Sequence, residues 1–223
     1  ASAAPFAYIT NQASNDVSVI DLASDRVIAT IPVGKSPAGV VVSDRAGKVF
    51  VSNPESKSIS VIDLASNRVI DSIDAGRGPV GIDAAPDGRR LYVADWYANA
   101  LLVFDAATHR RIGEVPVGKA PAGVAVAPNG VLIYVANRDD DSIGIVDAAT
   151  LRQVATVAVG SHPFAVGLTP DGARLFALNV LSNDVSVIDT GTRQVISTIA
   201  VGKSPYGVAF SAQAVGGMFG LYF

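Results

Sequence analysis

Ser14-Asn15-Asp16-Val17-Ser18-Val19-Ile20-Asp21 decides the fold, because the same eight residues recur without change as residues 182–189. Related apolar stretches that end in aspartate fill the interval. The aspartates stand 42 residues apart, at Asp21, Asp63, Asp105, Asp147 and Asp189. A Gly-x-x-Pro motif follows each, with the prolines at Pro37, Pro79, Pro121, Pro163 and Pro205. A constant period without insertions indicates five copies of one structural unit.

Each unit has room for four short strands and no amphipathic helix. In the third unit, the pattern predicts strands at 121–126, 132–136, 142–147 and 153–157. These runs are rich in Val and Ile and are separated by turn sequences such as Pro-Asn-Gly at 128–130. Four antiparallel strands repeated every 40–45 residues are typical of a β-propeller blade. The sequence therefore predicts an all-β, five-bladed β-propeller over residues 1–210.

The two ends of the repeat array complement each other. The array opens with strands of the second, third and fourth type, at 6–10, 17–21 and 27–31, and finishes with one first-type strand at 206–210. Pairing of the strand at 206–210 with the strand at 6–10 completes the opening blade and removes two open sheet edges. We therefore expect these two terminal strands to close the ring.

The repeat motifs also resemble a known family. Tyr-Ile-Thr-Asn at 8–11 is followed by the aspartate stretch and by Val-Gly-Lys-Ser-Pro at 33–37, and Tyr-Val-Ala-Asn at 134–137 is a variant of the first motif. This pattern, over residues 6–210, resembles the YVTN-type β-propeller repeat family. The resemblance implies a bacterial or archaeal exported protein. Members often have seven blades, so five repeats make either a small closed ring or part of a longer protein.

Composition limits the function classes. The 223 residues are 49% hydrophobic and 17% charged, with a net charge of -3 and no cysteine. The missing cysteines remove disulfides, thiolate metal sites and cysteine nucleophiles. No apolar run approaches the roughly 20 residues of a membrane-spanning helix. The small residues at 1–5 look like a remnant near a secretory cleavage site, so we expect a periplasmic or extracellular location.

Two apparent nucleotide motifs fail on context. Gly76-Arg77-Gly78-Pro79-Val80-Gly81 matches Gly-x-Gly-x-x-Gly, but a strand follows it instead of the helix that a dinucleotide site needs. Gly34-Lys35-Ser36 ends like a P-loop, but Pro37 stands where the helix would start. Both motifs belong to the repeat, and we predict no cofactor.

The carboxylates and histidines favour structural roles. The repeated aspartates precede turns, so each is expected to accept backbone N–H groups. Asp139 and Asp141 are the weak candidates for a metal site, but they lack the glycine and the twelfth-position ligand of a calcium loop. His109 and His162 fall in loops of opposite faces, so they cannot share one metal. No catalytic triad is visible, and the chain is not expected to be an enzyme.

One face of the ring collects the distinctive side chains. Loops between blades and loops between second and third strands emerge on the same side. We call this side the loop-rich face. The candidate ligand-binding residues on it are Lys35, Arg77, Trp96, Tyr97, Lys119, Arg138, His162, Phe164, Lys203 and Tyr206. The cations favour an anionic group, and Trp96 and Tyr97 favour stacking on a ligand.

The sequence therefore predicts a non-enzymatic binding or scaffold module. Its expected partner is a protein, a glycan or a small anionic ligand. The alternatives are a metal-dependent propeller enzyme similar to lactonases or lyases, and a propeller that binds single-stranded nucleic acid. Acidic loops offset the lysines, which weighs against nucleic acid. The apolar tail at 211–223 is expected to dock on the ring or on a second copy, although a monomer is the main expectation.

Overall fold

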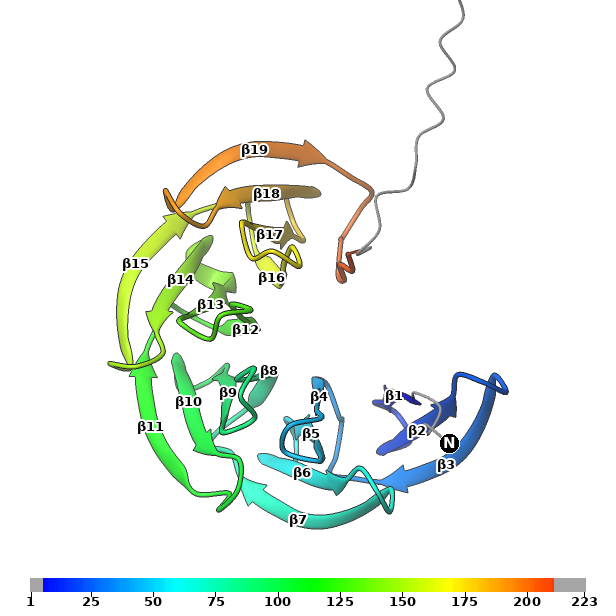
Figure 1. Ribbon diagram of the computed structural model, residues 1–223. Helices are drawn as coiled ribbons and strands as arrows, with labels where there is room; N and C mark the ends of the chain where they lie inside the picture. The colour runs from blue at the N-terminus through cyan, green and yellow to red at the C-terminus, as the bar shows by residue number, and fades with distance from the viewer. Residues whose placement is uncertain (1–5, 211–223) are drawn as a thin grey trace, which may run out of the picture.

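The computed structural model describes residues 6–210 as five antiparallel sheets arranged around one axis (Figure 1). Every strand follows the Val- and Ile-rich runs of the repeat. The predicted tail at 211–223 lies outside the described residues. The five repeats therefore form five propeller blades, as predicted.

Four blades have four strands each, and the first blade has three. The first blade holds β1 (Phe6–Asn11), β2 (Asp16–Asp21) and β3 (Arg26–Pro32). The second holds β4 (Val40–Ser43), β5 (Lys48–Asn53), β6 (Ser58–Asp63) and β7 (Arg68–Asp74). The third holds β8 (Pro79–Ala84), β9 (Arg90–Asp95), β10 (Ala100–Asp105) and β11 (Arg111–Pro116). The fourth holds β12 (Pro121–Val126), β13 (Leu132–Asn137), β14 (Ser142–Asp147) and β15 (Arg152–Ala158), with the 3₁₀ turn η1 (Arg138–Asp140) between β13 and β14. The fifth holds β16 (Pro163–Leu168), β17 (Arg174–Asn179), β18 (Asp184–Asp189) and β19 (Gln194–Ala200).

The core lies between the blades. Four clusters of buried apolar side chains each join two neighbouring sheets. Phe50 and Ile59 of the second blade, for example, pack with Leu91 and Phe104 of the third. Burial of these clusters is the main force that holds the blades side by side. Within the described residues, no helix is long and apolar enough to cross a membrane.

The closure of the ring is not seen in the structure. The first sheet has three strands in the order β1-β2-β3, and residues 206–210 form no strand. This segment lies instead beside the fifth blade, where Phe164 of β16 contacts Tyr206 and Phe176 of β17 contacts Phe210. Figure 1 shows an open arc between the segment and β1. The predicted pairing of the terminal strands stays a prediction.

Candidate functional site

The loops of the loop-rich face bind one another through their backbones. Trp96 donates its backbone N–H to Gly78, Arg138 donates to Ala120, and Val180 donates to His162. Loops between blades and loops between second and third strands therefore lie together on one side. The candidate residues within these loops belong to a single face of the protein.

Three aromatic side chains form a row on this face. The ring centroids of Trp96 and Phe164 are 6.4 Å apart, and those of Phe164 and Tyr206 are 5.0 Å apart. The guanidinium carbon of Arg138 lies 5.3 Å from the Trp96 ring, within cation–π distance. We call Trp96, Phe164 and Tyr206 the aromatic row. The row gathers side chains from three separate repeats.

The aromatic row borders an apolar cavity in the central channel. The cavity has a volume of about 530 Å³, and Phe164 and Tyr206 line it. Its wall is built from the first residues of the innermost strands, such as Val80–Ile82 and Ala122–Val124. Tyr206 is 60% exposed. The mouth of the channel therefore offers aromatic surface beside an apolar hollow.

Tyr97, the neighbour of Trp96 in the chain, packs over a glycine. The Tyr97 side chain is 69% exposed, and its ring occupies the space that a Cβ on Gly78 would need, with Cδ2 only 2.6 Å from that position. Other repeats carry Ser36, Ala120 or His162 at this place. Gly78 thus serves the packing of Tyr97, which explains the apparent Gly-x-Gly-x-x-Gly motif without a nucleotide.

The acidic loop at 139–141 connects the fourth blade to its two neighbouring blades. Asp139 pairs with Arg138 at 2.6 Å. Asp140 accepts the backbone N–H of Lys119 at 2.7 Å and lies 3.7 Å from its ammonium group. Asp141 accepts the backbone N–H of His162 at 2.8 Å. Each carboxylate therefore has a protein partner.

Asp139 and Asp141 flank His162 without forming a set of metal ligands. Nε2 of His162 lies 3.8 Å from Asp139, and Nδ1 lies 3.9 Å from Asp141. Across residues 6–210, no three His, Cys, Asp or Glu side chains converge in a way that could hold a metal ion. The geometry of this loop gives the weak metal candidates no further support.

One of the four cations that recur on the loop-rich face is neutralised by a carboxylate. Lys35, Arg77, Lys119 and Lys203 occupy the same position in their repeats. Among these four, only Lys119 forms an ion pair within the described residues. Arg138, the other cation of the face, is paired with Asp139. The face carries both signs of charge rather than a uniform positive field.

The polar residues that end the second strands are structural. Asn53, Asn137 and Asn179 are buried, and each amide nitrogen donates to a serine on the adjacent third strand. Asn53, Asp95 and Asn179 are the buried last residues of β5, β9 and β17, not exposed loop residues of the face. The sequence signal for this burial is the serine five or seven residues after each asparagine.

Asp95 replaces asparagine in the third blade for a physical reason. Ala100 and Leu102 stand where the second blade has Ser58 and Ser60, so an amide nitrogen would have no hydroxyl to bind. The carboxylate instead accepts backbone N–H groups from Arg77 at 2.7 Å, Gly78 at 2.9 Å, and Tyr97 and Ala98 at 3.2 Å. Asp95 therefore fixes the loops that carry Tyr97 and its neighbour Trp96.

The repeated aspartates act in turns, as predicted. Asp189, for example, accepts the backbone N–H of Thr192 at 2.7 Å and its hydroxyl at 2.9 Å. These two hydrogen bonds hold the pKa of Asp189 below its usual range. Asp105 and Asp147 have the same bonds to Thr108 and Thr150. These carboxylates belong to the scaffold.

His109, the other histidine, lies on the face opposite the loop-rich face, as predicted. Lys48 donates to Nε2 of His109 at 3.0 Å, and Nδ1 of His109 lies 2.5 Å from the Asp71 carboxylate. The bond to His109 lowers the pKa of Asp71. Lys48 also donates to the carbonyl oxygen of Ala106 at 2.9 Å. The three side chains link the second and third blades.

Asp83 is the only ionisable residue of the innermost strands β4, β8, β12 and β16, and it gives a pH-dependent prediction. Desolvation raises its pKa, although the backbone N–H groups of Val126 and Ala84 donate to it at 2.8 Å. A raised pKa in the folded state means that Asp83 contributes most stability below its unfolded pKa of about 3.9, and loses it as pH rises through the folded value. We expect Asp83→Asn to become more stable relative to wild type between about pH 4 and pH 7.

Urea denaturation across that pH range measures the effect of Asp83→Asn. Asp189→Asn is the matched control. Because the pKa of Asp189 is lowered, its stabilisation is lost only as pH falls below the unfolded pKa of about 3.9, so this variant should keep a constant difference from wild type across that range. Equal pH profiles for Asp83→Asn and wild type would contradict the burial argument.

Comparisons with known proteins agree with the fold. A chain of Kuenenia stuttgartiensis hydrazine synthase matches with 26% identity and a TM-score of 0.70, over 74% of this chain and 49% of that one. A functionally unknown protein from Desulfotomaculum acetoxidans matches with 16% identity and a TM-score of 0.78, over 91% of this chain and 68% of that one. This chain thus spans about half the length of the hydrazine synthase chain.

No curated protein matches the sequence. A family model, however, matches it twice, over residues 41–131 and 125–215, and its description is YNCE-like beta-propeller. These two matches cover most of the described blades. They confirm the propeller fold. They do not test the resemblance to the YVTN-type repeat. The chain belongs to the YNCE-like beta-propeller family.

Proposed function

We propose that this protein is a non-enzymatic, exported binding module that holds a protein partner on its loop-rich face. The observation that carries the proposal is the aromatic row with Arg138 stacked on it, beside the apolar cavity of the channel. Trp, Tyr and Arg are the residues that most often dominate the energy of protein interfaces. Phe164 and Tyr206 line a hollow that can accept an apolar side chain of a partner.

The charges around the row fit the rim of such an interface. Lys35, Arg77 and Lys203 lie on the same face as the acidic loop, so both signs surround the aromatic centre. Interfaces commonly have an apolar centre and a polar rim. The pairing of Lys119 with Asp140 and of Arg138 with Asp139 weakens the case for single-stranded nucleic acid.

Selection of peptides on the immobilised protein tests this function. Trp96 is the only tryptophan, so its fluorescence reports binding at the row. We expect a displayed library of random 12-residue peptides to yield binders with an aromatic or large aliphatic residue. These peptides should shift the Trp96 emission, and Phe164→Ala and Tyr206→Ala should weaken them at least tenfold, by about 1.4 kcal/mol.

Ile112→Ala is the matched control, because Ile112 is an exposed apolar residue on the outer strand β11. This variant should bind the peptides like wild type. Peptides that bind the Phe164 and Tyr206 variants equally well, or that leave the Trp96 emission unchanged, would contradict the proposal. Quenching by oligothymidine that weakens steeply with salt would instead favour the nucleic-acid alternative.

We also propose that residues 206–210 pair with β1 when the ring closes. The repeat supports this proposal, since 206–210 occupies the repeat position of an innermost strand and the first blade lacks one. Both segments have backbone groups without a sheet partner on the facing edge, and such edges favour strand addition.

A further inference from the structure

A second cavity lies on the side opposite the loop-rich face. Its volume is about 790 Å³. It is lined by the turns between first and second strands of the second to fourth blades, by Tyr92 of β9, and by Ala148 and Ala149. Antiparallel strands place these turns at the end of the sheet away from Trp96 and Tyr206. Cavities of this size accommodate small organic ligands. The cavity is separate from the aromatic row.

Three arginines and one carboxylate supply the charge of this cavity. The arginines are Arg45, in the turn before β5, and Arg89 and Arg90, at the start of β9. The carboxylate is Asp87. The lining therefore has a net charge of about +2, in a protein whose total charge is -3. A positive hollow on an acidic protein attracts anions.

Two of these arginines depart from the repeat. The residues equivalent to Arg45 are Asp87, Asn129 and Asp171. The residues equivalent to Arg89 are Gly47, Val131 and Ala173. The blade therefore folds without a cation at either position. Arg45 and Arg89 are not needed for the turn.

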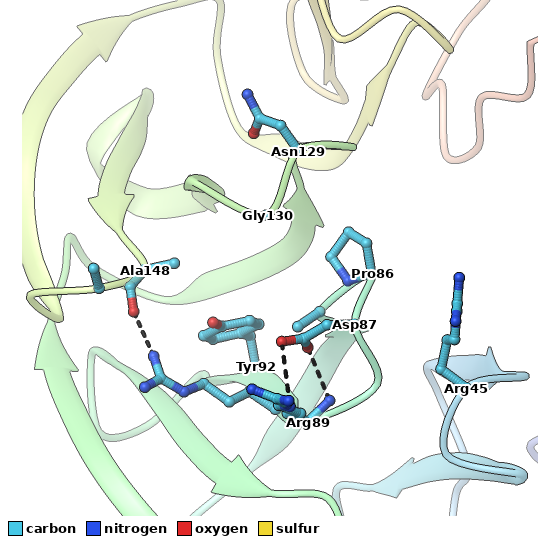
Figure 2. Close-up of a pocket in the computed structure, with 11 residues that line it drawn as sticks. Arg45, Pro86, Asp87, Arg89, Tyr92, Asn129, Gly130 and Ala148 are labelled. Atoms are coloured by element: carbon cyan, nitrogen blue, oxygen red, sulfur yellow. Dashed lines mark hydrogen bonds and ion pairs between the residues drawn. The ribbon is translucent and has the colours of Figure 1, made fainter.

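The turns bring these arginines to one cavity. Gly88 has a positive φ of 72°, and a Cβ there would come within 2.6 Å of Cβ of Arg45. The turn at 86–89 can therefore pack directly against the turn that carries Arg45. Figure 2 shows Arg45 on the right side of the lining and Arg89 at its lower centre, next to Asp87.

Arg90 is held in place from the neighbouring blade. It donates to the carbonyl oxygen of Ala148 at 2.5 Å. Asp87 accepts the backbone N–H of Arg89 at 2.9 Å and lies 4.0 Å from its Nε. The Arg89 side chain is 85% exposed, so its remaining donors face solvent. The guanidinium group of Arg90 is therefore held by a hydrogen bond, and those of Arg45 and Arg89 are accessible to a ligand in the cavity.

We propose that this cavity binds a small oxyanion with more than one charged group, a phosphate- or carboxylate-bearing molecule. Guanidinium groups match phosphate and carboxylate oxygens with paired hydrogen bonds. Arg45 and Arg89 supply donors from two blades, and the ligand joins them. The site acts independently of a partner on the loop-rich face.

Calorimetric titration at low ionic strength tests the site, with pyrophosphate and citrate as probes. We expect at least one probe to bind wild type, and Arg45→Gln and Arg89→Gln each to weaken it about tenfold or more, because each removes charge-assisted hydrogen bonds. Both side chains lie outside the core, so the variants should fold. Arg152→Gln is the matched control, since it removes one exposed arginine at the start of β15.

The two probes separate the sources of the oxyanion. Tighter binding of pyrophosphate indicates a phosphorylated ligand, and tighter binding of citrate indicates a polycarboxylate. Either result supports the site when Arg152→Gln binds like wild type. Binding of neither probe, equal binding by all variants, or equal weakening by Arg152→Gln would overturn the proposal. None of these outcomes depends on the Trp96 signal, so the two binding proposals fail separately.

Discussion

Asp95→Asn is expected to lower the free energy of unfolding by about 2–4 kcal/mol, although it changes only one atom of a side chain. Asp95 is 1% exposed and accepts four backbone N–H groups, two of them from the loop before β8 and two from the loop after β9. An amide has one oxygen in place of two, so some of these donors lose their acceptor. Its nitrogen would also face Leu102 instead of a hydroxyl group. Urea denaturation of the variant measures the loss.

The reverse exchange in the fifth blade tests the same reasoning. The amide nitrogen of Asn179 donates to Asp184 at 2.6 Å and to Ser186 at 3.0 Å. Asn179→Asp places a second carboxylate beside Asp184, so we expect a loss of similar size. Asn53→Asp is the control with a smaller expected loss, because Ser58 and Ser60 have hydroxyl groups that can donate to a carboxylate. Tolerance of both Asp95→Asn and Asn179→Asp would show that the repeat does not select these side chains.

Periodicity carried most of the fold prediction. The strands of the third repeat were predicted to within one residue at each end, because turn sequences such as Pro-Asn-Gly mark their limits. The pairing of 206–210 with β1 is different in kind. It depends on the curvature that five blades adopt together, and that curvature arises from packing between sheets rather than from any one repeat.

The face of the candidate site followed from strand alternation, but its contacts did not. Trp96, Arg138 and Phe164 were assigned to one face because their loops emerge on the same side. Arg138 stacks on Trp96 and also pairs with Asp139. This arrangement depends on the turn η1, which no sequence motif predicts. The sequence also contains a signal in Arg45 and Arg89, because no other repeat has a cation at either position.

Gly81→Ala is expected to lower the free energy of unfolding by about 3 kcal/mol or more. A Cβ on Gly81 would fall on the carbonyl oxygen of Ala122 in the next innermost strand. A Cβ on Gly39 would lie 2.7 Å from the carbonyl oxygen of Val80, and a Cβ on Gly123 would lie 2.6 Å from that of Phe164. Backbone cannot move aside as a side chain can, so the blades must separate. Thermal and urea denaturation measure the loss, and an unchanged midpoint would contradict tight backbone packing around the channel.

Gly207 turns this contact into a test of ring closure. It is the equivalent glycine of the last repeat, and in the open arc nothing lies within 4 Å of a Cβ placed there. In a closed ring the repeat places it against the carbonyl oxygen of Ala38, so closure predicts that Gly207→Ala destabilises by about 2 kcal/mol. The same register places Val208 opposite Ile9, and a cysteine pair there, in a chain without cysteine, should form a disulfide within one molecule. A neutral Gly207→Ala together with no disulfide would mean that the arc stays open. A disulfide between two molecules would mean that residues 206–210 of a second copy pair with the edge of β1.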